Sequence, residues 1–284
     1  MAELLKGAAV AAAINEKYAN KSADLRASGI VPTLAILRAG ERDDALSYER
    51  GAVKRAEQLG VDVKKVVLPE DVPAGSFYEA LDGLNNDPSV HGILVLQPLP
   101  KQIDTEKVFD MLLPEKDIDG STAGSLAGVF TNKNLGFAPC TAQAVMEILK
   151  FYGIGLKGKK VAVIGRSLVI GRPVAMMLMH ENATVTICHT KTEDIPAVTK
   201  AADIVVAASG QMESINKDYL SEGQILIDVG ISWNDKKQKL CGDLAAEDAD
   251  ALAKAYTPVP GGVGAVTTSV LISHVVDAAE KTLK

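Results

Sequence analysis

The chain has 284 residues, of which 47% are hydrophobic and 23% charged, and its formal net charge is −6. This length suggests two domains of ordinary size, and the composition is typical of a soluble globular protein. The acidic balance and the lack of a dense basic run argue against a nucleic-acid partner. No apolar run approaches the roughly 20 residues of a membrane span, so no membrane partner is expected either.

The cysteines and histidines predict no metal site and no disulfide framework. The three cysteines are odd in number and widely spaced, and the four histidines fall in separate segments. The Ala-rich N-terminus is interrupted by charged residues, so it reads as an amphipathic helix and not as a signal peptide. Reduced thiols without a signal peptide favour a cytoplasmic protein.

Strand-like and helix-like segments alternate through the first half of the chain. The runs TLAIL and GILVL are short and apolar, and turn residues follow each of them. This alternation predicts the βαβ pattern of an open parallel sheet. The expected strands are residues 33–37, 61–68 and 92–96, and the expected helices are residues 43–59, 76–84 and 104–113.

After Pro139 the pattern restarts with a helix and the strand KVAVIG. The sequence therefore predicts an α/β fold with two parallel open sheets, the second of Rossmann type. We expect one domain from residues 1–139 with the C-terminal helix 267–284, and a second from residues 140–266. The expected elements are strands 160–165, 185–188, 204–208 and 225–229 and helices 141–152, 171–179 and 267–283.

The segment VAVIGRSLVIGRP is a glycine-rich turn between a strand and a helix. The strand runs into Gly165 and the next helix starts at Gly171, so backbone N–H groups and a helix N-terminus could meet a pyrophosphate. The segment departs from G-x-G-x-x-G, because Ser167 and Ile170 stand where that pattern has its second and third glycines. A tight turn that needs glycine only for its backbone geometry remains an alternative.

The residues after the next strand bear on the choice of cofactor. Sites that prefer NAD place an acidic residue there for the ribose 2′-hydroxyl, whereas His189, Thr190 and Lys191 follow this strand. Arg166, Ser167, Thr190 and Lys191 could instead bind a 2′-phosphate. The pattern favours NADP over NAD.

Several loops follow the C-terminal ends of strands, where open α/β sheets bind ligands. One comes before Tyr48, and another is the turn Gln97–Pro100. PEKDIDG carries Asp117 and Asp119, and TPVPGGVGAVT is rich in proline and glycine, which is typical of a fixed loop that approaches a ligand closely.

Together these motifs resemble the methylenetetrahydrofolate dehydrogenase/cyclohydrolase family over nearly the whole chain. The resemblance implies a homodimer with folate bound in a cleft between the two α/β domains. It also implies two reactions of one-carbon metabolism, NADP-dependent oxidation of 5,10-methylenetetrahydrofolate and hydrolysis of the methenyl product. The motifs are Tyr48, Pro98–Pro100, Pro114–Gly120, Pro139–Thr141, Gly165–Pro173, Asp228–Ile231 and Pro258–Gly264.

The resemblance assigns roles to individual residues. It implies that Tyr48 packs on the folate ring and that Asp119 hydrogen-bonds the pterin, which makes both the catalytic candidates. The expected substrate contacts are Tyr48, Ala52, Leu96, Gln97, Pro98, Asp119, Pro260, Gly261, Gly262 and Val263. The expected cofactor contacts are Gly165, Arg166, Ser167, Gly171, Arg172, Thr190 and Ile231.

The chain departs from the family pattern at the residues that serve hydrolysis. The family lysine, four residues after the tyrosine, is replaced by Ala52, and the glutamine that contacts this lysine is replaced by Leu96. Gln97 should face the other side of the extended chain. At about 100° per residue, Lys54 and Arg50 lie about 240° and 200° from the direction of Tyr48, so neither points where the lysine would.

Hydride transfer depends mainly on positioning, whereas hydrolysis needs a placed acid or base worth about 10²–10⁴-fold in rate. We therefore expect dehydrogenase activity with weak or absent cyclohydrolase activity. Three alternatives remain open. The enzyme could be fully bifunctional, it could hydrolyse through Gln97, Lys54 or an ordered water, or the chain could be a non-catalytic folate- or nucleotide-binding regulator.

Overall fold

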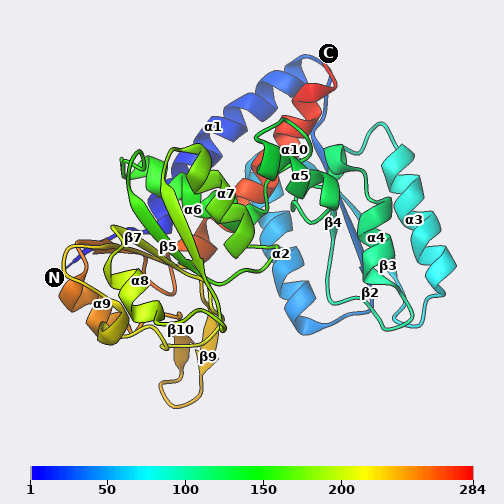
Figure 1. Cartoon of the computed structure of the whole chain (residues 1–284). Helices are drawn as coiled ribbons and strands as arrows, with labels where there is room; N and C mark the ends of the chain where they lie inside the picture. The colour runs from blue at the N-terminus through cyan, green and yellow to red at the C-terminus, as the bar shows by residue number, and fades with distance from the viewer. Residues whose placement is uncertain (1, 284) are drawn as a thin grey trace. The chain divides into compact units, whose positions relative to one another are not determined.

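A computed structural model describes residues 2–283, apart from the side chain of Asp44. The chain forms two compact units, each built on a parallel sheet (Figure 1). We call them the three-strand unit, Ala12–Cys140 with Thr268–Lys284, and the six-strand unit, Met1–Ala11 with Thr141–Thr267. Residues 1 and 284, the outer ends of the expected domains, lie outside the described residues.

The three-strand unit has a parallel sheet in the order β3-β2-β4. The middle strand is buried along nearly its whole length, because helices cover both faces of the sheet (Figure 1). On one face, Phe77, Leu81 and Leu84 of α3 join the core at helical spacing. The elements are β2 (Thr33–Ala39), α2 (Asp43–Gln58), β3 (Asp62–Leu68), α3 (Ala74–Asn86), β4 (Gly92–Val95), α4 (Thr105–Met111), η1 (Pro114–Lys116) and α5 (Ala123–Thr131).

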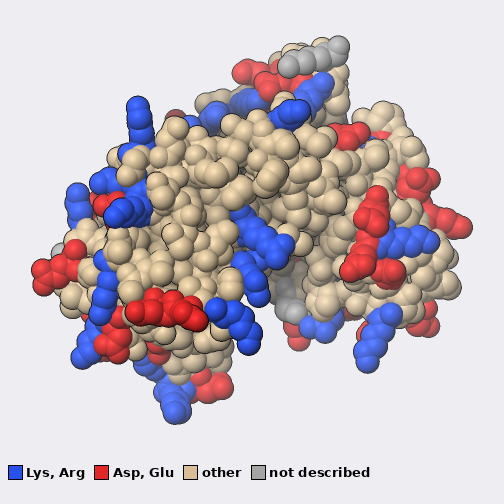
Figure 2. Space-filling view, viewed as in Figure 1, with Lys and Arg blue, Asp and Glu red and all other residues tan. Residues whose placement is uncertain are grey.

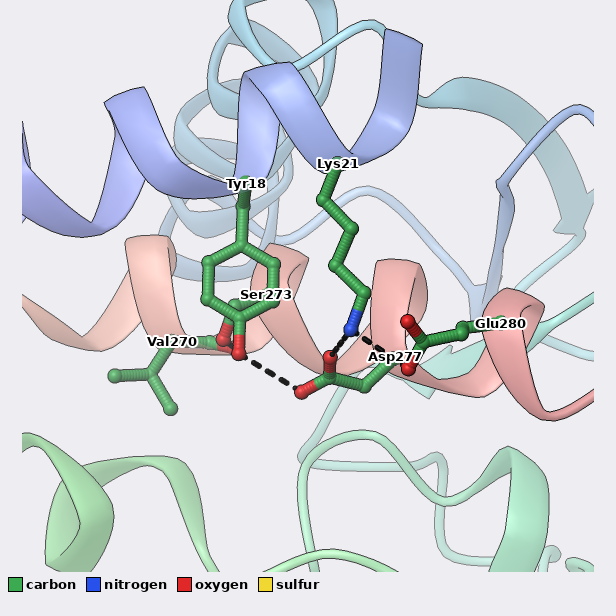
Figure 3. Close-up of polar contacts among 6 residues, drawn as sticks. All are labelled: Tyr18, Lys21, Val270, Ser273, Asp277 and Glu280. Atoms are coloured by element: carbon green, nitrogen blue, oxygen red, sulfur yellow. Dashed lines mark hydrogen bonds and ion pairs between the residues drawn. The ribbon is translucent and has the colours of Figure 1, made fainter. Parts of the chain in front are cut away.

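Helices from the two ends of the chain meet in this unit. They are α1 (Gly7–Ala27) and α10 (Thr267–Lys281). The Tyr18 hydroxyl donates to Asp277 Oδ2 at 2.9 Å, and Lys21 Nζ pairs with Asp277 and Glu280 at 2.7 and 2.8 Å (Figure 3). These pairs are partly exposed, so they fix the alignment of the helices more than they stabilise the fold.

The six-strand unit has the order β1-β11-β8-β7-β5-β6, with every neighbouring pair parallel. An antiparallel hairpin of β9 and β10 follows β8. The elements are β1 (Glu3–Leu4), α6 (Cys140–Phe151), β5 (Lys160–Ile164), α7 (Gly171–His180), β6 (Thr184–Cys188), α8 (Ile195–Lys200), β7 (Ile204–Ala207), η2 (Lys217–Tyr219), β8 (Ile225–Asp228), β9 (Ser232–Asn234), β10 (Lys239–Cys241), α9 (Ala246–Leu252), β11 (Ala255–Tyr256) and η3 (Val263–Ala265).

The N-terminal segment corrects one expected boundary. The sequence pattern predicted that residues 1–11 belong to the first domain, but the described residues 2–11 belong to the six-strand unit. The reason is backbone pairing. Glu3 N donates to Lys254 O at 3.0 Å and Leu5 N donates to Tyr256 O at 2.8 Å, so β1 becomes the edge strand beside β11.

The surface charges and the cysteines of the described residues indicate no further binding site. Basic and acidic side chains are interspersed on the face shown in Figure 2. All three cysteines are free and buried. Within residues 2–283, no helix is both long and apolar enough to cross a membrane, and no three His, Cys, Asp or Glu side chains are grouped as metal ligands would be.

Candidate active site

Two titratable side chains of the three-strand unit, Asp119 and Cys140, lie close to Tyr48. Tyr48 comes from α2, Asp119 follows η1, and Cys140 begins α6. Burial raises the pKa of Asp119 to about 6, partly opposed by a hydrogen bond from the Cys140 thiol and increased by Asp117. Burial likewise raises the pKa of the Tyr48 hydroxyl and the pKa of the Cys140 thiol, and the nearby Asp119 charge adds to both shifts. The cluster therefore holds an acid that titrates near neutral pH.

The helix that carries Tyr48 is fixed by a buried ion-pair network at the next residue. The Glu49 carboxylate contacts Arg38 Nε at 2.8 Å and Lys65 Nζ at 2.7 Å, which ties α2 to both β2 and β3. Burial disfavours the charge on Glu49, but hydrogen bonds from Lys65 and Arg38 outweigh it and lower its pKa. Removing Glu49 would take from the buried Arg38 its carboxylate partner at 2.8 Å, so this network holds the middle of α2 against β2 and β3.

The two acids of the KDIDG motif have different roles. Asp117 is buried and accepts hydrogen bonds from Ser121 N at 3.0 Å and Thr122 N at 2.7 Å, so it holds the turn. In this turn Gly120 has φ +72°, and a Cβ there would overlap the backbone of the Ala138–Pro139 segment. Asp119 instead accepts a hydrogen bond from the Cys140 thiol.

A buried histidine fixes the peptide next to Asp119. His274 on α10 places Nδ1 2.8 Å from Ile118 O, and because a carbonyl only accepts, Nδ1 carries the proton. Burial lowers the pKa of His274, and Phe137 stacks on its ring with centroids 4.9 Å apart. The Cys140 Sγ also contacts Ile118 O at 3.3 Å. Sequence analysis missed this role of His274, because the two partners lie far apart in the chain.

The residues that replace the expected lysine–glutamine pair are apolar and buried. Ala52 is fully buried on α2, and Leu96 is buried directly after β4. The next residue, Gln97, is exposed, and the Gln97–Pro98 bond is cis. Lys54 is exposed, as the helical-wheel argument predicts. The position of the family's lysine is therefore occupied by a buried methyl group and carries no charge.

The proline–glycine loop, Pro258–Gly264, belongs to the six-strand unit, whereas Tyr48 and Asp119 belong to the three-strand unit. Gly261 has φ +101°, and its carbonyl accepts from Gly7 N at 2.8 Å. A Cβ on Gly262 would crowd Pro258 O, and Val263 is buried. The loop is thus held by the N-terminal segment in a conformation that glycine permits.

A cavity of about 320 Å³ lies at the C-terminal ends of β5, β6 and β7. Four of the expected cofactor residues line it, namely Gly165, Arg166, Ser167 and Thr190. Gly165 has φ +125°, and a Cβ there would overlap Ala208 O, so the strand-to-helix turn requires glycine. No acidic side chain is among the lining residues, which leaves room for a 2′-phosphate beside Arg166. This lining suits the phosphorylated ribose of a dinucleotide.

The other three expected cofactor residues do not line this cavity. Gly171 is buried and packs against the Gly165 carbonyl, which a Cβ on Gly171 would overlap, so the turn requires glycine there as well. Arg172 and Ile231 are exposed. Several lining residues come from the segment after β7, which the sequence analysis recognised as a strand end but not as part of the site. The additional lining residues are Ile164, His189, Ile195, Ala208, Ser209, Gln211, Ser214, Ile215 and Tyr219.

Family models match most of the chain. Residues 5–119 match the catalytic domain of tetrahydrofolate dehydrogenase/cyclohydrolase, and residues 139–283 match its NAD(P)-binding domain. The bifunctional protein FolD of Carboxydothermus hydrogenoformans is 47% identical over 281 residues, 99% of this chain and 98% of that protein.

Solved structures agree over the same length. The bifunctional enzyme FolD of Campylobacter jejuni has a TM-score of 0.95 at 35% identity, covering 99% of this chain and all of that chain. The Trypanosoma brucei methylenetetrahydrofolate dehydrogenase-cyclohydrolase, solved with NADP cofactor and inhibitor, has a TM-score of 0.91 at 34% identity, covering 100% and 99%. With the half-buried acid beside Tyr48 and the glycine-lined cavity, these matches show that the chain belongs to the tetrahydrofolate dehydrogenase/cyclohydrolase family.

Proposed function

We propose that this chain oxidises 5,10-methylenetetrahydrofolate to the methenyl form with NADP and hydrolyses that product slowly or not at all. The observation that carries the second half is the fully buried Ala52, one helical turn after Tyr48. In the resembled family this position holds the lysine that serves hydrolysis, and a methyl group can neither donate nor accept a proton.

The two units divide the work of binding. The three-strand unit holds the folate, with the Tyr48 ring against it and the Asp119 carboxylate accepting hydrogen bonds from the pterin. The six-strand unit holds NADP in the 320 Å³ cavity, where Arg166, Ser167 and Thr190 surround the 2′-phosphate. The other substrate contacts that the resemblance implies are Leu96, Gln97 and Pro98 of the three-strand unit and Pro260–Val263 of the six-strand unit. The resemblance also implies cofactor contacts at Gly171, Arg172 and Ile231, which do not line the cavity.

The residues present suit a hydride transfer. When bound, NADP supplies the acceptor for the hydride that leaves the methylene carbon. Asp119 fixes the pterin, because its position is held by the His274 and Cys140 contacts to Ile118 O. No side chain has to give or take a proton in this step, so orientation supplies most of the rate.

Hydrolysis of the methenyl bridge lacks its proton carrier. The Lys54 and Arg50 side chains are exposed on α2. Arg55 lies about 20° from the direction of Tyr48, but its guanidinium donates to Gln58 Oε1 at 2.9 Å, further along the helix. Leu96 offers no hydrogen-bonding group. These observations support the loss of a general acid or base worth about 10²–10⁴-fold in rate.

One observation favours full bifunctionality as a second candidate. Several relatives of this chain carry the name bifunctional protein FolD, one of them at 47% identity. A bifunctional enzyme would need Gln97 or an ordered water to take the lysine's part. Under either candidate we propose a homodimer, as the family resemblance implies, and a cytoplasmic location, as the cysteine pattern and the N-terminal composition favour.

The proposal is tested with purified protein in two separate assays. In the first, NADP is reduced in the presence of 5,10-methylenetetrahydrofolate, and NAD supports a slower rate. In the second, methenyltetrahydrofolate given alone disappears at close to its uncatalysed rate. No NADP reduction would refute the dehydrogenase and leave a non-catalytic binding protein, whereas rapid hydrolysis in the second assay would favour the bifunctional enzyme.

A further inference from the structure

Two buried carboxylates join the loops at the C-terminal edge of the six-strand sheet. Asp228 ends β8, and Asp243 follows β10 of the hairpin. Asp228 Oδ1 accepts from Gly230 N and Asp243 N at 3.0 Å each, and Oδ2 accepts from Leu244 N at 3.0 Å. Asp228 thereby holds the hairpin's return segment against the sheet. Asp243 N is one of these donors, whereas the Asp243 side chain binds a different segment.

The Asp243 carboxylate is directed at the segment that lines the cofactor cavity. Its Oδ2 accepts three hydrogen bonds, from Ser209 N at 2.6 Å, Ser209 Oγ at 2.9 Å and Gly210 N at 2.9 Å. Ser209 lines the cavity, and the neighbouring Ala208 carbonyl packs against Gly165 of the glycine-rich turn. A charged acceptor makes such hydrogen bonds stronger than a neutral one does.

The packing around Asp243 leaves its position little freedom. The residue is fully buried, and Oδ1 has no hydrogen-bond partner among residues 2–283. Oδ1 lies against Gly230, where a Cβ would overlap it, and a Cβ on Gly242 would overlap the Asp228 carboxylate. If Asp243 served only to hold the hairpin, hydrogen bonds to hairpin donors would be expected. Its side chain instead binds only the Ser209–Gly210 turn among the described residues.

We propose that Asp243 is a positioning residue for NADP: it orients the Ser209–Gly210 turn so that this wall of the cavity accepts the dinucleotide. The proposal rests on the proposed NADP site and adds a residue outside it. Asp243 does not line the cavity. Asp243 sets the direction of two backbone N–H groups and one hydroxyl. Its loss lets the turn relax into the cavity. The affinity for the dinucleotide should therefore fall by a larger factor than the rate of hydride transfer.

The first comparison is of NADP affinity between wild-type protein, D243A and D243N, measured by titration calorimetry. The Asp243→Ala change removes all three acceptor contacts, and we expect the Kd for NADP to rise about tenfold or more. The Asp243→Asn change keeps an oxygen at the Oδ2 position, so most of the affinity should return. In turnover assays KM for NADP should rise in D243A while KM for the folate stays near wild type and kcat changes less.

A matched control is D203A, at the other end of β7. The Asp203 carboxylate also accepts a backbone N–H, from Lys160 at 2.8 Å, but lies away from the cavity lining. Asp203→Ala should leave the Kd for NADP unchanged. If D243A fails to fold, D243E takes its place. It keeps the charge and displaces the carboxylate by one methylene, and it should also raise the Kd about tenfold.

The outcomes separate this inference from the proposed function. Wild-type protein that binds no NADP would refute the proposed function itself. Wild-type binding together with an unchanged Kd in D243A or D243E would overturn the role of Asp243. A lowered thermal stability of D243A with unchanged affinity would also overturn it, because that is what a purely structural residue would show. A raised Kd that D243N restores, with D203A unaffected, supports the proposal.

Discussion

At the residue scale, the sequence indicates which residues form the candidate site, but only the structure shows what surrounds their side chains. The family resemblance selects Tyr48 and Asp119 as candidate site residues. It does not reveal that Asp119 has a pKa of about 6, because burial and the charge of Asp117 raise this pKa against the opposing hydrogen bond from Cys140. It also misses His274, whose contact with Ile118 O joins residues 156 positions apart. Side-chain environments depend on long-range packing, which a single sequence does not show.

The raised pKa of Asp119 predicts how turnover depends on pH. The carboxyl is protonated below about pH 6 and accepts pterin hydrogen bonds fully only above it. The kcat/KM for methylenetetrahydrofolate, measured at saturating NADP, should fall about tenfold from near pH 7 to near pH 5. D119N should be slow and nearly independent of pH over this range. A wild-type profile without this fall would contradict the assigned role.

The same pKa shift has a consequence for stability. A carboxyl whose folded pKa lies above its unfolded pKa stabilises the fold at low pH, and that contribution disappears as pH rises through the folded value of about 6. Compared with D119N, the wild type should therefore lose about 3 kcal/mol of unfolding free energy between about pH 4 and pH 7. Urea denaturation of both proteins at the two pH values measures the difference, and an equal response would contradict burial of the acid.

Restoring the family pair is the direct test of why hydrolysis is weak. Neither single change should suffice, because A52K buries a lysine without a partner and L96Q buries an amide without one. Together, Ala52→Lys and Leu96→Gln should raise the rate of methenyltetrahydrofolate hydrolysis by at least about tenfold. V53K, on a partly exposed neighbouring position, is the control and should have no such effect. An unchanged rate in the double variant would show that other residues limit hydrolysis.

At the element scale, long periodic segments were predictable and short ones were not. The seven expected strands all form, with ends within about two residues, as do the expected main helices. The helices α5, α8 and α9, the hairpin and the two-residue strands β1 and β11 were missed. Two or three residues carry no measurable alternation, so only backbone pairing with distant segments defines these strands.

The glycine-rich turn gives a prediction at this scale. Gly165→Ala introduces a Cβ at φ +125° and forces it into Ala208 O, so the turn must move. We expect the Kd for NADP to rise about tenfold or more, with a loss of about 2 kcal/mol in unfolding free energy. Gly155→Ala is the control, because a Cβ there meets nothing within 4 Å, and its affinity should be unchanged. Equal affinity in G165A and wild type would contradict the placement of the cofactor.

At the scale of the whole molecule, the two-sheet architecture followed from the restart of the βαβ pattern after Pro139. The division of the chain between the sheets was not fully predictable. Residues 2–11 belong to the six-strand unit, because β1 pairs with β11 over two residues, and Gly7 N in the same segment donates to Gly261 O of the proline–glycine loop. The N-terminus thus supports a loop that lies late in the sequence.

Ligand binding should be visible in the stability of the whole chain. A dinucleotide that binds only the folded six-strand unit at about 100 times its Kd adds about 2.7 kcal/mol to the unfolding free energy. We expect NADP to raise the thermal midpoint more than NAD at equal concentration, because Arg166 and Thr190 line the cavity and no acid does. Thermal-shift scans measure both, and a larger shift with NAD would contradict the cofactor preference.

The central claim is that oxidation proceeds without efficient hydrolysis. Its most direct test follows purified enzyme with 5,10-methylenetetrahydrofolate and NADP, recording NADPH and the methenyl product in the same reaction. The account predicts that methenyl product accumulates in step with NADPH and then decays only at its uncatalysed rate. If NADPH rises while methenyl product disappears faster than that rate, the site activates water without the lysine, and the explanation built on Ala52 and Leu96 is wrong.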